Sequence, residues 1–347
     1  MKISCYQKKY ARNFSPQSRN SLIYRRVTKA FLLGAGLGTR LRPLTSRVPK
    51  PLVPFFHRPL ILHAWQACRD LGCTDFAINT HHLPDVWQDS MLGLGACDWR
   101  TLDEFGGNGC AVKQGILDGS QIRLFEEPTL LETGGGLRNI RKWIGADSVL
   151  VHNGDIFSTM DLRALVDTHQ QSGLPVTLGL RSDGVAKHIA LDETGERVVD
   201  IRNKLGKADG SHVFSGVYCV NATLFDYLPE EEIISVIPAF LRLAELGKLG
   251  AVLLDEGHWF DLGERESYLA AHQLFGIGPM IHPLAKITAG AIVENSAIGP
   301  EAIIEASAIV RNSVVWPHAR IGADAVLDRC IVYSANITNG THQNADI

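Results

Sequence analysis

The 347-residue chain lacks the features that mark several classes of protein. It contains no run of about 18 apolar residues, so we expect no membrane-spanning helix and no membrane partner. Its seven cysteines are odd in number and include no CxxC pair, which argues against a zinc site and a disulfide framework and favours reduced thiols in a cytoplasmic protein. Aromatic residues make up 7% of the chain and charged residues 20%, which is too ordinary for a disordered chain or a coiled-coil rod.

Acidic residues are missing from the first 69 positions, which carry 14 Lys or Arg residues before the first carboxylate at Asp70. The rest of the chain has 20 basic and 37 acidic residues, a net charge of −17. A positive amino-terminal part suits an anionic ligand. Nucleic acid is one such ligand by charge alone, but the motifs described below favour a small phosphate compound, and we expect no nucleic-acid partner.

The segment from Met1 to Lys29 holds eight of these basic residues, separated by Ser, Asn and Gln. It has no continuous apolar stretch of the kind found in a secretory signal, although an organelle transit peptide shares its composition. A disordered tail translated from an upstream start codon also explains it and is the simpler interpretation. We therefore expect residues 1–27 to be a basic tail, a transit peptide or an upstream segment outside the fold.

Short apolar strands alternate with helical patterns through most of the chain. Strands are predicted at 30–33, 76–79, 122–125 and 148–151, and helices at 59–71, from Pro84 onward and at 137–144, after a glycine loop at 132–136. Such alternation predicts an α/β domain at 28–276 with a Rossmann-like, mostly parallel sheet covered on both faces. Ligands of such sheets bind at the carboxyl ends of the strands.

From Ile281 the pattern changes to aliphatic residues at steps of six, six and five, so that Ile287, Ile304 and Ile321 lie 17 residues apart. Three short sides per coil, each with one inward aliphatic residue, predict a short left-handed parallel β-helix at 280–340. We expect little more than three coils. An unfinished end of such a prism favours stacking with a second copy, so we expect a homo-oligomer to form through the β-helix.

The most informative motif is the glycine loop GAGLGTRLRPLT at 34–45, which follows a strand. Glycines let backbone N–H groups approach a phosphate closely. A dinucleotide fingerprint would need a third glycine at Thr39 and an acid about 20 residues later, and a P-loop would need Gly-Lys-Ser/Thr. Both are absent. Arg40, Arg42 and Lys50 supply positive charge, and the prolines flanking Lys50 fix its backbone, although a lysine in a stiff surface loop is an equally simple interpretation.

Two aspartates follow other predicted strands. Asp155 ends an apolar strand through an Asn-Gly turn, and Asp261 follows two aromatic residues. Two such carboxylates, with phosphate oxygens and water, make a hard oxygen site suited to Mg²⁺. The alternatives are a turn aspartate that bonds to its own backbone for Asp155 and a helix-start residue for Asp261.

These motifs are similar to those of a known enzyme family. The loop at 34–45 and the segment PKPLVP at 49–54 are very similar to the signature of sugar-1-phosphate nucleotidyltransferases, also called NDP-sugar pyrophosphorylases. The later segments LETGGG (131–136), NGD (153–155), FSG (214–216) and WFDLG (259–263) fit in the same order. The similarity covers residues 28–275, and members of this family also carry hexapeptide tails. Parts resemble the N-acetylmuramate-1-phosphate uridylyltransferases and parts the mannose- and heptose-1-phosphate guanylyltransferases.

The resemblance implies a GT-A-like fold, Mg²⁺ as cofactor, and a nucleoside triphosphate (UTP or GTP) and a sugar 1-phosphate as substrates. It implies the following roles for residues of this chain. The catalytic residues are Arg40, Lys50, Asp155 and Asp261, the last two as metal ligands. The nucleotide-binding residues are Leu33, Gly34, Ala35, Gly36, Gly38 and Thr39 with Arg40 and Lys50. The substrate-binding residues are Glu132, Gly135, Asn153, Lys204 and Gly216. Lys204 stands where the family usually has a Glu-Lys-Pro segment, so its role rests on position alone.

Two other functions fit parts of the sequence. A non-catalytic homologue that senses a nucleotide-sugar should have lost Arg40, Lys50 or an aspartate, and this chain keeps all four. A bifunctional enzyme with an acyltransferase tail would place a catalytic histidine in the β-helix. His318 is present there, but the predicted helix has too few coils for that activity.

Overall fold

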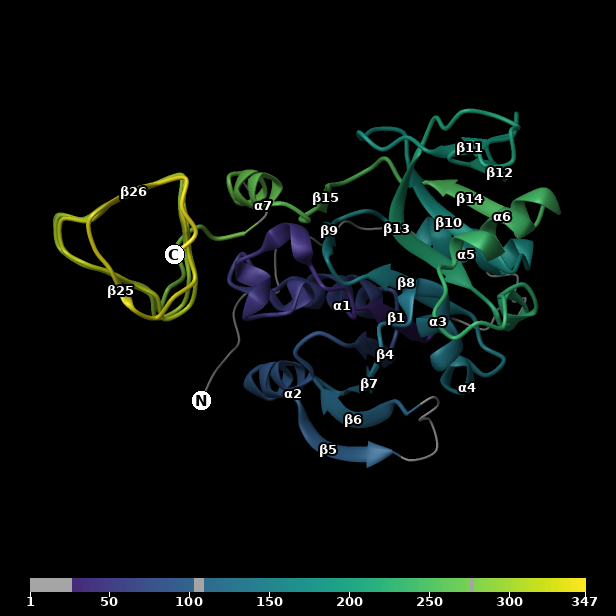
Figure 1. Ribbon diagram of the computed structural model, residues 1–347, viewed down its shortest axis with the longest axis horizontal. Coiled ribbons are helices and arrows are strands. Elements are labelled where there is room, and N and C mark those ends of the chain that lie inside the picture. Colours follow the sequence, from purple (N-terminus) through teal and green to yellow (C-terminus); the bar gives the residue numbers. More distant parts are fainter. Residues whose placement is uncertain (1–26, 103–108, 275–277) are drawn as a thin grey trace, which may run out of the picture.

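The computed structural model describes residues 27–102, 109–274 and 278–347. Figure 1 shows a large α/β part and, beside it, a triangular prism formed by the carboxyl-terminal residues. The basic segment predicted at 1–27 lies outside the described residues except for Val27. Within the described ranges no helix is long and apolar enough to cross a membrane.

The α/β part is built on a nine-stranded sheet with the order β14-β10-β13-β8-β1-β4-β7-β6-β5. Its centre, β8-β1-β4-β7, is parallel, whereas β13 pairs antiparallel with both β8 and β10, and β6 pairs antiparallel with β7. The sheet strands are β1 (Lys29–Leu33), β4 (Asp75–Thr80), β5 (Cys97–Leu102), β6 (Ala111–Leu117), β7 (Ser120–Glu126), β8 (Val149–Asn153), β10 (Val176–Arg181), β13 (Val213–Val220) and β14 (Leu249–Leu253).

Helices cover both faces of this sheet, as the sequence predicts. Alternate residues of β1 point to opposite sides, so Phe31 joins one apolar cluster while Ala30 and Leu32 join the other. The first cluster is closed by α3, α4 and α6, and the second by α1, α2 and α5. The helices are α1 (Leu60–Asp70), α2 (Pro84–Gly93), α3 (Glu132–Asn139), α4 (Arg141–Ile144), α5 (Arg163–Ser172), α6 (Ile237–Glu245) and α7 (Arg265–His272).

The predicted loop at 132–136 is wrong, because α3 already begins at Glu132 and ends at Asn139, and α4 follows separately. Three consecutive glycines disfavour a helix in isolation. Here they serve close packing, since a Cβ on Gly134 would lie 2.9 Å from the Ile234 carbonyl oxygen and one on Gly135 only 2.4 Å from that of Glu232. The backbone N–H groups of Gly134 and Gly135 donate to the Ile234 carbonyl instead.

Smaller elements surround the sheet. They are β2 (Pro54–Phe55), β3 (Arg58–Pro59), β9 (Ile156–Ser158), β11 (Ile189–Leu191), β12 (Val198–Ile201) and β15 (Trp259–Asp261), with the single-turn helices η1 (Thr39–Leu41), η2 (Leu44–Ser46), η3 (Lys50–Leu52) and η4 (Ala222–Asp226). The antiparallel pair β9–β15 matters most for function, because it joins a segment that follows β8 to one that lies about a hundred residues later.

The prism is a parallel β-helix with the predicted repeat. Ile287 pairs through its strand with Ile304, Ile304 with Ile321, and Ile321 with Thr338, which confirms the 17-residue spacing. The last coil is shorter, because Leu327 pairs with His342, 15 residues later. The sheets are β16 (Lys286–Ile287), β19 (Ile303–Ile304), β22 (Arg320–Ile321) and β25 (Ile337–Thr338); β17 (Ile292–Glu294), β20 (Ile309–Arg311), β23 (Val326–Asp328) and β26 (Thr341–Gln343); and β18 (Ala297–Ile298), β21 (Val314–Val315) and β24 (Ile331–Val332).

One face of the β-helix packs against the α/β part. Trp316 donates its Nε1–H to the Tyr268 hydroxyl at 3.1 Å, and that hydroxyl donates to the Pro54 carbonyl at 2.5 Å. The same cluster buries Leu41 and Leu44, which lie in the second half of the glycine loop. The β-helix therefore supports this half of the loop.

Candidate active site

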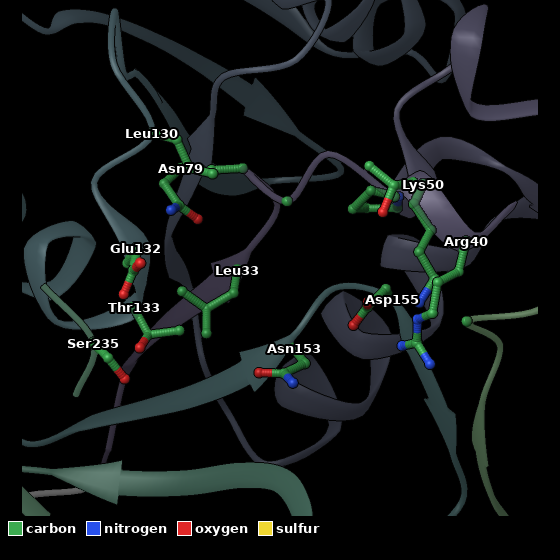
Figure 2. A pocket seen from close by; sticks show the side chains of 16 residues that line it. Leu33, Arg40, Lys50, Asn79, Leu130, Glu132, Thr133, Asn153, Asp155 and Ser235 are labelled. Carbon is green, nitrogen blue, oxygen red and sulfur yellow. Dashed lines mark hydrogen bonds and ion pairs between the residues drawn. The ribbon is translucent and has the colours of Figure 1, made fainter. Parts of the chain in front are cut away.

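A cavity of about 470 Å³ opens at the carboxyl ends of the central parallel strands, where the sequence predicts a ligand site (Figure 2). Its volume suits a ligand of nucleotide size. It is lined by Leu33, Ala35, Gly36, Gly38, Thr39, Arg40, Lys50, Pro51, Asn79, Leu130, Glu132, Thr133, Asn153, Asp155, Ser235 and Gly263. Ten of the predicted site residues are among them, and they come from four separate segments of the chain.

The glycine loop forms the floor of this cavity. Gly34 is fixed, because its N–H donates to Asn79 Oδ1 at 2.9 Å and a Cβ at this position would lie 2.7 Å from the Trp87 ring. Gly38 has a φ of +62° and packs against Thr45, so it too is required by the loop's own conformation. Gly36 is exposed and has open space around it. The absence of a side chain at Gly36 therefore serves the cavity rather than the fold.

Lys50 lies at the first position of η3, with its side chain only 7% exposed. Its Nζ is 2.7 Å from Asp155 Oδ2 and 3.4 Å from Asp261 Oδ1. The flanking prolines and the hydrogen bond from the Val53 N–H to the Lys50 carbonyl hold the backbone in place. Lys50 is thus an ion-paired group of the site, and the interpretation as a surface-loop lysine is wrong.

The two aspartates meet through strand pairing. Asp155 lies in the turn that leaves β8, and the next residue, Ile156, begins β9. In the β9–β15 pair Ile156 is directly opposite Asp261. This register places the two carboxylates side by side around the Lys50 ammonium. Neither aspartate is a helix-start residue, because the residue that caps α7 is Glu264.

Arg40 lies at the outer rim, in η1, with 62% of its side chain exposed. Its Nη1 is 3.2 Å from Glu264 Oε1, and its Nη2 is 3.9 Å from Asp261 Oδ2. A Cβ on Gly263 would lie 2.8 Å from Arg40 Nη2, so the glycine leaves room for the guanidinium. The exposed face of Arg40 remains available to an anion that enters the cavity.

The donor set fits a magnesium ion. Asp155 and Asp261 supply hard carboxylate oxygens that already surround one cation, the Lys50 ammonium. In the described part of the chain no group of three or more His, Cys, Asp or Glu side chains could hold a metal. A two-carboxylate site of this kind leaves the remaining positions of a metal to water and phosphate oxygens, as Mg²⁺ sites for phosphate substrates do.

The end of the cavity opposite Arg40 and Lys50 is lined by neutral polar side chains and one carboxylate. Figure 2 shows Asn79, Glu132, Thr133 and Ser235 together at this end, with Arg40, Lys50 and Asp155 at the other and Leu33 and Asn153 between them. Glu132 has a φ of +59°, at the start of α3.

Sequence reasoning missed two residues behind this end. Asn79 donates through Nδ2 to Glu127 Oε1 at 2.9 Å, and Glu127 Oε2 accepts the Leu131 N–H at 3.1 Å. Burial raises the pKa of the Glu127 carboxyl. No local pattern in the sequence distinguishes either residue, because their burial depends on the tertiary structure.

Three predicted substrate residues do not line the cavity. Gly135 is buried inside α3, where it serves the close packing described above. Gly216 lies in β13, and a Cβ there would lie 2.8 Å from Asn153 Nδ2, so this glycine makes room for Asn153. Lys204 is exposed in a turn after β12. Their predicted roles remain expectations.

Comparisons with known proteins agree with this geometry. The nucleotidyl transferase family model matches residues 29–276, and the model for the GlmU-like C-terminal hexapeptide matches residues 281–343. The chain is 28% identical over 283 residues to mannose-1-phosphate guanylyltransferase of Mycobacterium tuberculosis, covering 76% of this chain and 72% of the relative. It is also 28% identical over 279 residues to mannose-1-phosphate guanyltransferase 2 of Candida glabrata, covering 78% and 72%.

Solved structures share the fold. HddC from Yersinia pseudotuberculosis, complexed with GMP-PN, matches with a TM-score of 0.53 and 20% identity over 71% of this chain and 98% of that chain. A Bacillus anthracis protein assigned as a glucose-1-phosphate thymidylyltransferase matches with a TM-score of 0.55 and 23% identity over 70% and 93%. With the family model spanning well over half of its length, the chain belongs to the nucleotidyl transferase family and is an enzyme that transfers a nucleotidyl group.

Proposed function

We propose that the protein is a sugar-1-phosphate nucleotidyltransferase that converts a nucleoside triphosphate and a sugar 1-phosphate into an NDP-sugar and pyrophosphate. The observation that carries this proposal is the convergence of Lys50, Asp155 and Asp261 beside the glycine loop, with Lys50 Nζ 2.7 Å and 3.4 Å from the two carboxylates. Positive charge, exposed backbone N–H groups and two hard carboxylates together suit a magnesium-bound polyphosphate.

The polarity of the cavity supports one orientation of the triphosphate. In this orientation the phosphates would lie at the end that holds Arg40 and Lys50, and the nucleoside would extend toward Asn79 and Thr133. Arg40 binds the β- and γ-phosphates together with backbone N–H groups of the glycine loop, because a guanidinium donates two parallel hydrogen bonds to phosphate oxygens. Asn153, midway along the cavity, is positioned for the sugar hydroxyls.

The chemical step needs no covalent enzyme intermediate. An oxygen of the sugar phosphate forms a bond to the α-phosphorus, the bond from that phosphorus to the bridging oxygen breaks, and pyrophosphate leaves with the electron pair. The residues position two polyanions and stabilise the charge that spreads over the transferred group. A Mg²⁺ ion held by Asp155 and Asp261 would neutralise charge on the phosphates. Lys50 provides a compact positive charge for the α-phosphate.

Two combinations of nucleoside triphosphate and sugar phosphate are favoured as substrates. The relatives named for mannose 1-phosphate and GTP chemistry favour GTP with a hexose 1-phosphate, and the ETGGG segment favours UTP with an amino-sugar phosphate. The test is a pyrophosphate-release matrix of GTP, UTP, dTTP, CTP and ATP against a panel of sugar 1-phosphates with Mg²⁺. Release from one or two pairs supports the proposal, whereas no release from any pair contradicts it.

The two alternative functions give different outcomes. A regulatory homologue would bind an NDP-sugar without releasing pyrophosphate from any pair. An acyltransferase tail would consume acetyl-coenzyme A in the presence of the product. His318 lies 3.3 Å from Glu301 on the outside of the β-helix, where both side chains are more than half exposed, so this pair lacks the enclosed setting of a transferase site.

A further inference from the structure

Lys50 has a position that its proposed role at the α-phosphate does not explain. Its ammonium lies between Asp155 and Asp261, 2.7 Å and 3.4 Å from their nearest oxygens, and its side chain is 7% exposed against 35% and 45% for the two aspartates. These are the same two carboxylates that fit the metal. One cation of this chain therefore sits where the catalytic cation is required.

We propose that Lys50 is an internal counter-ion that must leave Asp155 and Asp261 before a divalent cation can bind there, and that the triphosphate receives the displaced ammonium. Metal and triphosphate then bind cooperatively, and the metal binds poorly by itself. This inference rests on the proposed function, because it assumes that the ligand between Lys50 and the glycine loop is a polyphosphate.

The two cations exclude each other because of distance. Mg²⁺ binds carboxylate oxygens at about 2.0–2.1 Å. A metal on Asp155 Oδ2 and an ammonium 2.7 Å from the same oxygen would be close neighbours, and the repulsion between their charges is strong where little water screens it. Lys50 must give up at least this oxygen when a metal binds.

The movement is confined to the side chain. The backbone at Lys50 is fixed by Pro49, Pro51 and the turn of η3, and the Lys50 Cβ packs so close to Gly38 that a Cβ on the glycine would lie 3.0 Å from it. Only the outer methylene groups can rotate. They carry the ammonium between the carboxylates and the glycine loop, which is the place of the phosphates.

The displaced ammonium needs a new partner, because a buried charge without one is costly. Among the described residues that line the cavity the acids are Asp155 and Glu132. Figure 2 shows Glu132 at the far end, away from Lys50. Among the described residues that line the cavity, no carboxylate other than Asp155 lies at the Lys50 end, whereas a triphosphate lying along the glycine loop does supply negative charge there.

The test measures Mn²⁺ binding by the loss of its free EPR signal, without nucleotide, in the wild-type enzyme and in two variants that each remove one positive charge near Asp261. Lys50→Met should bind Mn²⁺ at least ten times more tightly than the wild type. The matched control Arg40→Met, whose guanidinium is 3.9 Å from Asp261 and need not move, should stay within about threefold of the wild type. Equal or weaker binding by Lys50→Met, or an equal gain in Arg40→Met, overturns the inference.

The wild type gives a second measurement if Lys50→Met fails to fold. Mn²⁺ and inorganic tripolyphosphate together should raise Tm by more than the sum of their separate increases, and additive increases overturn the inference. Tripolyphosphate makes this measurement independent of the base. The two failures can be told apart. If the wild-type enzyme releases no pyrophosphate from any substrate pair, the proposed function is contradicted. If it does release pyrophosphate but Lys50→Met does not bind Mn²⁺ more tightly, only the role of Lys50 as counter-ion is contradicted.

Discussion

Asn79 and Glu127 form a buried hydrogen bond of 2.9 Å that links the glycine loop to the loop before α3, at the end of the cavity that holds Glu132. Asn79 also accepts the Gly34 N–H, and Glu127 accepts the Leu131 N–H, so one chain of hydrogen bonds runs from the glycine loop to the start of α3. Both loops owe their relative position to this pair.

Glu127→Gln should lower the free energy of unfolding by about 1–3 kcal/mol, because the amide has one acceptor oxygen for two donors and turns an NH₂ group toward one of them. The loops at the nucleoside end should loosen, so KM for the nucleotide should rise more than kcat falls. Urea unfolding and steady-state kinetics check this. The exposed Glu193→Gln is the control, and equal behaviour of the two variants would contradict a positioning role for Glu127.

Gly34→Ala and Gly36→Ala should separate the two uses of glycine in the loop. A Cβ on Gly34 would meet Trp87 at 2.7 Å, so we expect a loss of about 1–3 kcal/mol in unfolding free energy. Gly36→Ala should leave stability nearly unchanged but weaken triphosphate binding at least tenfold, because its Cβ enters the space for the phosphates. Unfolding curves and nucleotide titrations measure the two effects. Unchanged binding by Gly36→Ala would argue against the phosphate position.

Asp155→Asn and Asp261→Asn should each reduce pyrophosphate release at least a hundredfold, because each removes a proposed metal ligand. The exposed Asp226→Asn, on η4, is the matched control and should retain full activity. Normal turnover in either site variant would remove the metal assignment.

Asp155→Asn should also lower Tm, because it leaves the Lys50 ammonium, 7% exposed, with only the longer contact to Asp261. The double variant Lys50→Met with Asp155→Asn should recover part of this loss, since it removes the unpaired charge. Thermal melts of the three variants form a double-mutant cycle. Strictly additive changes in Tm would show that the two side chains do not interact.

Acid should destabilise the protein below pH 6.5. Burial lowers the pKa of His63, His169 and His272 from 6.5 to about 4, so the unfolded chain binds more protons than the folded chain between these values. Their stabilising effect is present above pH 6.5 and is lost as the pH falls toward 4, at up to about 1.4 kcal/mol per pH unit for each histidine. His169→Gln should flatten this dependence in urea unfolding at pH 7.5, 6.0 and 5.0, and the exposed His318→Gln should not.

Tyr268→Phe should weaken the attachment of the β-helix, because it leaves the Trp316 Nε1–H and the Pro54 carbonyl without their shared partner. We expect a loss of about 1–3 kcal/mol in unfolding free energy. Since Leu41 and Leu44 lie in the same cluster, KM for the triphosphate should rise as well. A loss of stability with an unchanged KM for the triphosphate would show that the β-helix does not support the glycine loop.

Local patterns in the sequence determined much of this protein. The central strands follow from short apolar runs, α1 from apolar residues at helical spacing, α2 from its opening proline, and the β-helix from a 17-residue repeat. In the glycine loop, Gly38 has a φ of +62°, a conformation that glycine adopts easily. Ten of the predicted site residues line one cavity, and most of them lie in local motifs at the end of a strand.

Only the tertiary structure decided how these motifs meet. The register of β9 against β15 brings Asp155 to Asp261, and no local pattern contains that pairing of distant segments. The helix through Gly134 and Gly135 depends on the backbone at 232–235, which packs where their side chains would be. Asn79 and Glu127 look like ordinary polar residues until burial leaves each as the other's partner. The sequence carries the local geometry, and long-range packing assembles the site, because contact between distant residues depends on the whole fold.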